Sequence, residues 1–197
     1  MAHRPGLTTD TVVRAAADLV DAEGPEALNL ARLAGKLSVR TPSLYNHITS
    51  LDDVRRRLAL YGARELEARL ARSAIGKSGD EGVFALTQAY RDFAREHPGV
   101  YAMGQRAATP DDRELTAAQE DVLAIMRAVL APYGLEGAAE VHALRALRSL
   151  AHGFVSLELA GGFGIPLDVD ESFRVLVGLC LDGLRSGRVR EVASSGR

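Results

Sequence analysis

The chain has 197 residues, 47% of them hydrophobic and 25% charged, which is typical of a globular protein and excludes a disordered one. Its apolar runs are too short to span a membrane, no apolar secretory segment follows Met1, and its single cysteine, Cys180, forms no internal disulfide. We therefore expect a cytoplasmic protein with no membrane partner. The net charge of −2 excludes a uniformly basic surface.

Helices are predicted along the whole chain, because no period-two alternation is sustained and aromatic residues make up only 5%. Thr8 or Thr9 can cap the first helix, which Gly24-Pro25 ends, and Asn29 can cap the second. The fold class is therefore all-α. The expected helices cover residues 10–23, 30–37, 42–48, 51–72, 80–96, 100–106, 110–131, 137–160 and 170–186.

The best domain boundary is the stretch 73–80, which is small, polar and glycine-containing. Residues 1–50 then form an N-terminal three-helix domain, and residues 51–73 form a linker helix that Ser50 can cap. Residues 74–190 form a C-terminal helical domain, and residues 191–197 are a tail.

One segment of the N-terminal domain lacks acidic residues. From Ala27 to Leu51 there is no Asp or Glu, and the segment contains Arg32, Lys36, Arg40 and His47. A face that docks on phosphates needs such a segment, although a solvated face of mixed charge can lack acids by accident.

Residues 29–48 have the dimensions of a helix-turn-helix, with a tight turn at residues 38–40. The second helix of that motif enters the major groove and presents its N-terminal residues to base edges. The spacing alone fits equally an ordinary helical corner with a polar exposed face. The residues expected to face inward are Leu33, Ala34, Leu37, Val39, Leu44 and Ile48, and those expected to face outward are Thr41, Ser43, Asn46 and His47, with Tyr45 beside them.

The residue pattern favours the DNA-binding interpretation. Leu33-Ala34, Leu37, Val39 and Pro42, followed by Leu44-Tyr45-Asn46-His47-Ile48, resemble the DNA-binding signature of the TetR/AcrR family of transcriptional regulators. The resemblance implies that Thr41, Pro42 and Ser43 contact base edges, and that Tyr45, Asn46 and His47 contact phosphate and sugar. Arg40 and Lys36 are further candidate DNA contacts.

Three positions depart from the family pattern. Ser38 stands where the family usually has glycine, so the turn must form without glycine's conformational freedom. Arg40 replaces the usual serine cap of the recognition helix, which leaves Thr41 to cap it. Leu51 replaces a lysine that often binds phosphate, so one electrostatic contact per subunit is lost.

The last two predicted helices indicate a dimer interface. Residues 173–181 contain one charge in nine residues, which is too apolar for a helix with a solvent face. Two such helices from each subunit can form an intersubunit four-helix bundle, as the family resemblance also implies. The alternative is that both are central helices of a monomer.

The resemblance further implies that the C-terminal domain binds a small effector. The segment from His152 to Phe163 is similar to the C-terminal subtype named after a Trp-His-Gly signature, although this chain has no tryptophan. The apolar character of the candidate pocket favours a hydrophobic ligand, while His152 also fits a buried, hydrogen-bonded histidine. The candidate ligand residues, chosen by helix position, are Phe93, Tyr101, Met126, Arg148 and His152.

An enzyme or metalloprotein built on a helical bundle is the competing interpretation. The sequence has no His-Glu-x-x-His or Glu-x-x-His pair, cysteine cluster, phosphate loop or nucleophile elbow, so we expect no catalytic residue, metal or cofactor. A helical adaptor without DNA affinity would require the motif to be vestigial. We expect a ligand-responsive regulator, a repressor that binds a near-palindromic operator as a homodimer and is released by a small, apolar effector. The alternative is a constitutive DNA binder whose C-terminal domain only dimerises.

Overall fold

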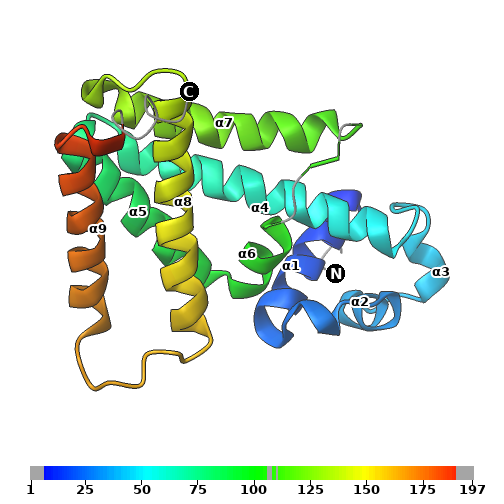
Figure 1. Ribbon diagram of the computed structural model, residues 1–197. Helices are drawn as coiled ribbons and strands as arrows, with labels where there is room; N and C mark the ends of the chain where they lie inside the picture. Colours follow the sequence, from blue (N-terminus) through cyan, green and yellow to red (C-terminus); the bar gives the residue numbers. More distant parts are fainter. Residues whose placement is uncertain (1–6, 106–107, 110, 190–197) are drawn as a thin grey trace. The chain divides into compact units, whose positions relative to one another are not determined.

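The computed structural model describes residues 7–189 except 106, 107 and 110, and these residues form helices with no strand among them (Figure 1). The all-α fold expected from the sequence is confirmed. The tail at 191–197 lies outside the described residues. The α-helices are α1 Thr9–Glu23, α2 Leu30–Leu37, α3 Thr41–Leu44, α4 Leu51–Ala74, α5 Gly79–Glu96, α6 Pro98–Gly104, α7 Arg113–Leu130, α8 Ala138–Leu159 and α9 Val169–Arg185, with 3-10 helices η1 Pro25–Ala27 and η2 Ala131–Tyr133.

Taken singly, none of the described helices is both long and apolar enough to cross a membrane, although the bent pair 113–133 and 138–159 meets that test by length and composition.

Local capping signals place the first helices where the sequence predicts them. The Thr8 hydroxyl accepts a hydrogen bond from the Thr11 amide and caps α1, which ends at Gly24 with φ at 83°. The Asn29 side chain accepts a hydrogen bond from the Arg32 amide at 2.9 Å and caps α2. Both predicted caps are confirmed, because a cap depends on residues only two or three positions apart.

The chain packs as two compact units whose boundary differs from the boundary at 73/74 expected from the sequence. Unit 1 contains the described residues up to Glu65 together with His97–Ala118, and unit 2 contains Leu66–Glu96 and the described residues from Gln119 onward. Thus α6 and the first residues of α7 group with the N-terminal helices. The reason lies in contacts between residues far apart in the sequence, which local composition does not reveal.

The first of these contacts joins α6 to the end of α1. Gly99 lies so close to α1 that a Cβ at this position would stand 2.1 Å from the Val20 carbonyl oxygen. Beside it the Val100 amide donates a hydrogen bond of 2.8 Å to the Asp21 carboxylate, whose other oxygen lies 2.8 Å from Nδ1 of His97. An acid of α1 therefore caps the N-terminus of α6, which has no side-chain cap of its own.

The second contact joins the start of α7 to α4. The Arg56 guanidinium donates from Nε and Nη2 to the two Asp112 carboxylate oxygens at 2.7 and 2.6 Å, and Nη2 also reaches Glu114 at 2.8 Å. Asp112 is almost completely buried, and the hydrogen bonds from Arg56 hold the pKa of its carboxyl below the ordinary value. This bidentate pair attaches the N-terminal end of α7 within unit 1.

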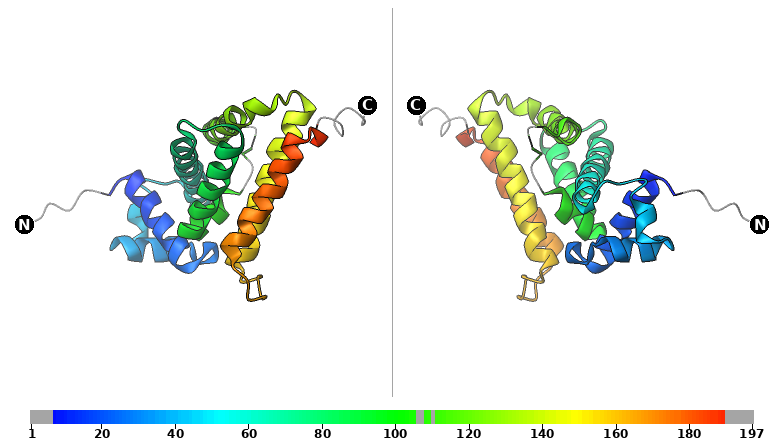
Figure 2. Two further views of the ribbon diagram at one scale, coloured as in Figure 1. Left: turned by 90° about the vertical axis from the view of Figure 1, so that its left-hand side faces the viewer. Right: turned by 90° about the vertical axis from the view of Figure 1, so that its right-hand side faces the viewer.

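Unit 2 is a helical bundle in which α5 contacts both α8 and α9. Helices α8 and α9 run side by side in opposite directions and are joined by the loop 160–168 (Figure 1, Figure 2). The apolar core includes Val83, Phe173 and Val177, none of which has an exposed side chain. The bounds of α5, α8 and α9 agree with the predicted helices to within one residue at each end.

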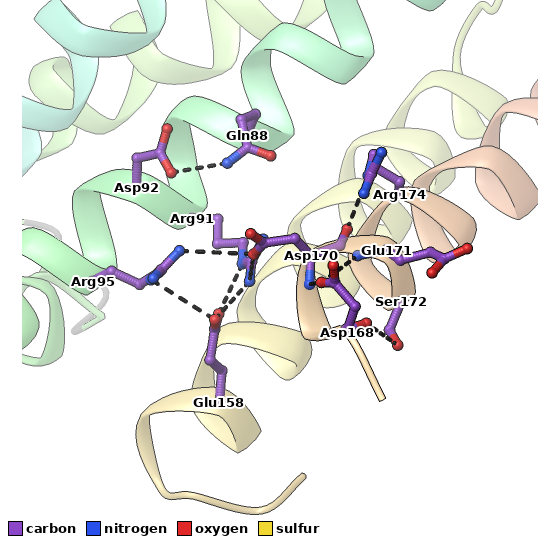
Figure 3. A network of polar contacts seen from close by, with 10 residues as sticks. All are labelled: Gln88, Arg91, Asp92, Arg95, Glu158, Asp168, Asp170, Glu171, Ser172 and Arg174. Carbon is purple, nitrogen blue, oxygen red and sulfur yellow. Dashed lines mark hydrogen bonds and ion pairs between the residues drawn. The ribbon is translucent and has the colours of Figure 1, made fainter. Parts of the chain in front are cut away.

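A buried arginine ties α5 to both helices of this pair (Figure 3). The Arg91 side chain is 1% exposed, donates to both Glu158 oxygens at 2.8 and 2.6 Å, and pairs with Asp170 at 2.7 Å. Its guanidinium carbon also lies 5.4 and 4.9 Å from the ring centroids of Phe154 and Phe173. The cation is therefore satisfied on its edge by carboxylates and on its faces by aromatic rings.

Candidate nucleic-acid interface

The turn between α2 and α3 forms without glycine. Ser38 has φ 56° and ψ 39°, which makes it the single non-glycine residue with positive φ in the described part of the chain. The amides of Ser38 and Val39 donate to the carbonyls of Gly35 and Ala34, each at 3.0 Å, and so close the end of α2. A non-glycine residue in this conformation costs about 1–2 kcal/mol, so the turn is formed at a local energetic cost.

The second helix of the motif, α3, is shorter than predicted and is capped differently. Its α-helical part is Thr41–Leu44, and turns continue to Ile48, whose amide donates to the Leu44 carbonyl at 3.1 Å. The prediction that Thr41 caps this helix is wrong. Arg40 is the N-cap residue and no side chain accepts a hydrogen bond there, because Thr41 already has helical geometry.

The apolar side of the motif packs into the core of unit 1. Leu33 and Leu44 have no exposed side-chain surface, and Ala34 and Ile48 are each 3% exposed, so their predicted inward orientation is confirmed. Leu37 and Val39, also predicted to face inward, are half-buried. A hydrogen bond of 3.1 Å from the Thr9 hydroxyl to the His47 carbonyl ties the end of the motif to α1.

The remaining side of the motif presents polar groups. Tyr45 is 54% exposed, although tyrosine is a large residue that a protein core readily accommodates. An exposed aromatic ring beside small polar groups fits a surface that contacts a partner. The other predicted contact residues are exposed at Lys36, Arg40, Pro42 and Asn46 and half-buried at Thr41, Ser43 and His47.

The cations of the acid-free segment differ in their partners. Arg32 forms an ion pair with Glu23, and the Lys36 ammonium lies 4.0 Å from the Asp18 carboxylate, so acids of α1 partly neutralise both. Arg40 is exposed and forms no ion pair with any residue that the structure describes. Among these three cations, Arg40 is therefore the one most readily available to a phosphate.

The motif is firmly connected to α4. The Ser50 hydroxyl accepts a hydrogen bond from the Asp53 amide at 3.1 Å, which confirms the predicted cap. The Asp53 carboxylate accepts from the Thr49 amide at 2.9 Å and from Arg57 Nε at 2.8 Å. Leu51, which occupies the family's usual lysine position, is the first residue of α4 and is half-buried.

The candidate ligand residues fall in different places. Tyr101 is 5% exposed and belongs to α6 in unit 1, whereas the other four belong to unit 2. Phe93 is 3% exposed, Met126 is half-buried against the unit 2 core, and His152 is half-buried on α8. Arg148 is exposed on α8. Phe93 and Met126 are therefore the candidates of unit 2 with the clearest contact to apolar surroundings.

Sequence reasoning missed the buried cluster around Arg91. The signal was present, because Val83, Thr87, Arg91 and Ala94 recur at helical spacing and all four are buried. An arginine on an otherwise buried stripe requires carboxylate partners, although the sequence does not show which carboxylates they are.

Three comparisons with known proteins agree with this geometry. Residues 83–179 match the family described as "Tetracyclin repressor-like, C-terminal domain". The chain is 38% identical over 184 residues to the HTH-type transcriptional regulator YobS of Bacillus subtilis (strain 168), covering 93% of this chain and 96% of that relative. It is 36% identical over 172 residues to the HTH-type transcriptional regulator Rv0681 of Mycobacterium tuberculosis (strain ATCC 25618 / H37Rv), covering 87% and 78%. This chain belongs to the TetR family of transcriptional regulators.

The solved structures agree on the fold. The Streptomyces coelicolor TetR family protein ActR, in complex with (S)-DNPA, superposes with a TM-score of 0.65 at 21% identity and covers 93% of this chain and 100% of its own. The exposed side of α2, the turn and α3 is therefore the helix-turn-helix of a TetR family regulator. Its relatives YobS and Rv0681 are transcriptional regulators and not enzymes.

Proposed function

We propose that this TetR family protein is a ligand-responsive repressor that binds a near-palindromic operator as a homodimer. The observation that carries the proposal is the exposed polar side of the helix-turn-helix, where Tyr45 is 54% exposed and Arg40 has no ion-pair partner in the described part of the chain. Base edges are contacted from Thr41, Pro42 and Ser43, and the backbone from Tyr45, Asn46, His47, Arg40 and Lys36. The site of action is the cytoplasm, where bacterial DNA lies.

The dimer is supported by the outer side of α8 and α9. Val175 and Leu179 are 57% and 66% exposed, although they lie on a helix whose opposite side is fully buried. A helix with two apolar sides buries only one of them in a monomer, which favours a partner for the other. The exposed large apolar side chains of this region are Val141, Leu157, Leu159, Phe163, Ile165, Leu167, Val175 and Leu179.

The effector is a small, largely apolar molecule that binds unit 2. Support comes from the apolar surroundings of Phe93 and Met126, and from the fold neighbour ActR, whose structure contains (S)-DNPA. Binding must differ in affinity between the DNA-competent and the released conformation to change operator affinity. A compound that raises the melting temperature of the protein yet leaves operator affinity unchanged supports instead the constitutive binder whose C-terminal domain only dimerises.

An operator selected from a random DNA library tests the DNA-binding side. We expect Tyr45→Ala to weaken binding to all sequences alike by about 1–3 kcal/mol, roughly 5- to 150-fold, because a backbone contact is lost while the core stays intact. Fluorescence anisotropy measures both selected and unrelated DNA. Ser43→Ala is the matched comparison and should instead change the preference at one or two base pairs per half-site. Unchanged affinity of a folded Tyr45→Ala variant would show that another surface binds DNA.

A further inference from the structure

The pair of helices α8 and α9 has two edges whose positions can be derived from one contact. The rings of Phe154 in α8 and Phe173 in α9 have centroids 4.9 Å apart, so these residues lie on the facing sides of the two helices and at the same level along them. The two helices run in opposite directions (Figure 1). Moving toward the N-terminus of α8 is therefore the same direction as moving toward the C-terminus of α9.

Two charged residues occupy equivalent places on the two outer edges. Arg145 lies nine residues before Phe154, which is about 2.5 turns, so it lies on the side of α8 that points away from α9 and ~13.5 Å along the helix. Asp182 lies nine residues after Phe173, which places it on the side of α9 that points away from α8, also ~13.5 Å along. Because the helices are antiparallel, Arg145 and Asp182 stand at the same level on opposite edges.

The two edges carry opposite charge. Arg145 and Arg148 are exposed on α8, and neither forms an ion pair with any residue in the described ranges. Glu171 falls on the same edge of α9 as Asp182, since the eleven residues between them are about three turns. Asp182 is 71% exposed and bonds only to the neighbouring Arg185 at 2.9 Å in the described part of the chain. Thus α8 has a basic edge and α9 has an acidic edge.

An apolar face with open glycine positions lies between these edges. Leu157 of α8 and Leu179 of α9 are 53% and 66% exposed on it. Gly153 and Gly183 have no atom within 4 Å of a Cβ built at their positions, so the backbone of each helix is open to close approach. This face takes a second copy of itself, because its two edges complement each other in charge.

A twofold axis can join two such faces in two ways. An axis across the helices places α8 against α8, so the two basic edges meet each other and the two acidic edges meet each other. An axis along the helices places α8 of one subunit against α9 of the other, so that each basic edge meets an acidic edge. The second arrangement also preserves levels along the helices, which brings Arg145 opposite Asp182 of the partner subunit twice per dimer.

We infer that the homodimer pairs α8 with α9 of the partner subunit and that Arg145 and Asp182 of the partner subunit form an ion pair that selects this arrangement. The inference rests on the proposed homodimer and specifies its geometry. Apolar burial between the faces supplies affinity, whereas the charged edges exclude the arrangement with like charges together.

A charge-reversal experiment with the full chain tests the pairing. Sedimentation velocity first establishes that the parent protein is a dimer. Arg145→Glu and Asp182→Arg, each alone, should raise the dimer dissociation constant about tenfold or more, because like charges then meet twice per dimer. Mixing the two variants should produce a heterodimer, since positions 145 and 182 carry opposite charges in both of its contacts. Arg72→Glu, at an exposed position of α4, is the control and should leave the dimer unchanged.

The outcomes separate the inference from the proposed function. A monomeric parent protein overturns the homodimer and the pairing together. A dimeric parent whose variants show no preference for the heterodimer overturns the pairing alone. A measurement on the parent protein serves if a variant misfolds. Its dimer should weaken when NaCl is raised from about 0.05 to about 0.5 M, because exposed ion pairs are screened, and salt-independent dimerisation contradicts the pairing.

Discussion

Gly99→Ala should destabilise the protein by about 3 kcal/mol or more in urea or thermal unfolding. The added Cβ would stand 2.1 Å from the Val20 carbonyl oxygen and 2.6 Å from the Asp21 amide nitrogen, and these backbone atoms cannot rotate away. Relief requires α6 to move off α1. That movement breaks the bond from the Val100 amide to the Asp21 carboxylate, which at 2.8 Å is a hydrogen bond to a charged group.

Gly104→Ala is the matched control for this prediction. Gly104 lies in the same short helix, and no atom stands within 4 Å of a Cβ built there. We expect its substitution to be neutral or to stabilise the protein by up to about 1 kcal/mol, because alanine favours the helix more than glycine does. Equal stability of the two variants would show that the close approach of α6 to α1 does not hold in solution.

Arg91→Met should cost about 3 kcal/mol of unfolding free energy, because it leaves the partly buried Glu158 carboxylate without its main partner. Arg91 is 1% exposed, whereas Asp170 is 65% exposed and can regain water, so the loss arises mainly at Glu158. Arg95→Met is the matched control one turn along α5. Arg95 is 49% exposed and stands 3.7 and 3.9 Å from the same two carboxylates, so its loss should cost less than about 1 kcal/mol.

The pH dependence checks the same cluster. Hydrogen bonding and charge attraction from Arg91 hold the pKa of Asp170 below its ordinary value, so this carboxylate stabilises the fold above the unfolded-state pKa of about 4. That contribution is lost as the pH falls through the lowered pKa. The stability difference between the parent protein and Arg91→Met should therefore shrink below about pH 4 in urea unfolding. A difference that stays constant down to acid pH would contradict a role for this carboxylate.

The sequence by itself determined the helices and the DNA-binding motif. The caps at Thr8, Asn29 and Ser50 act over two to four residues, so they form wherever those residues occur. The inward positions of Leu33 and Leu44 follow from helical periodicity, which is equally local. For this reason the all-α fold and the buried side of the helix-turn-helix follow from the pattern of residues, and the family signature follows from their identity.

Only the tertiary structure decided which distant residues meet. It assigned α6 to unit 1 through Gly99, gave Lys36 and Arg32 acidic partners on α1, and found the carboxylates of Arg91 at positions 158 and 170. It also showed that α9 buries one apolar side and exposes the other, with Leu179 66% exposed. An ion pair or a close approach depends on the position of two backbones in space, whereas propensity and periodicity describe one segment at a time.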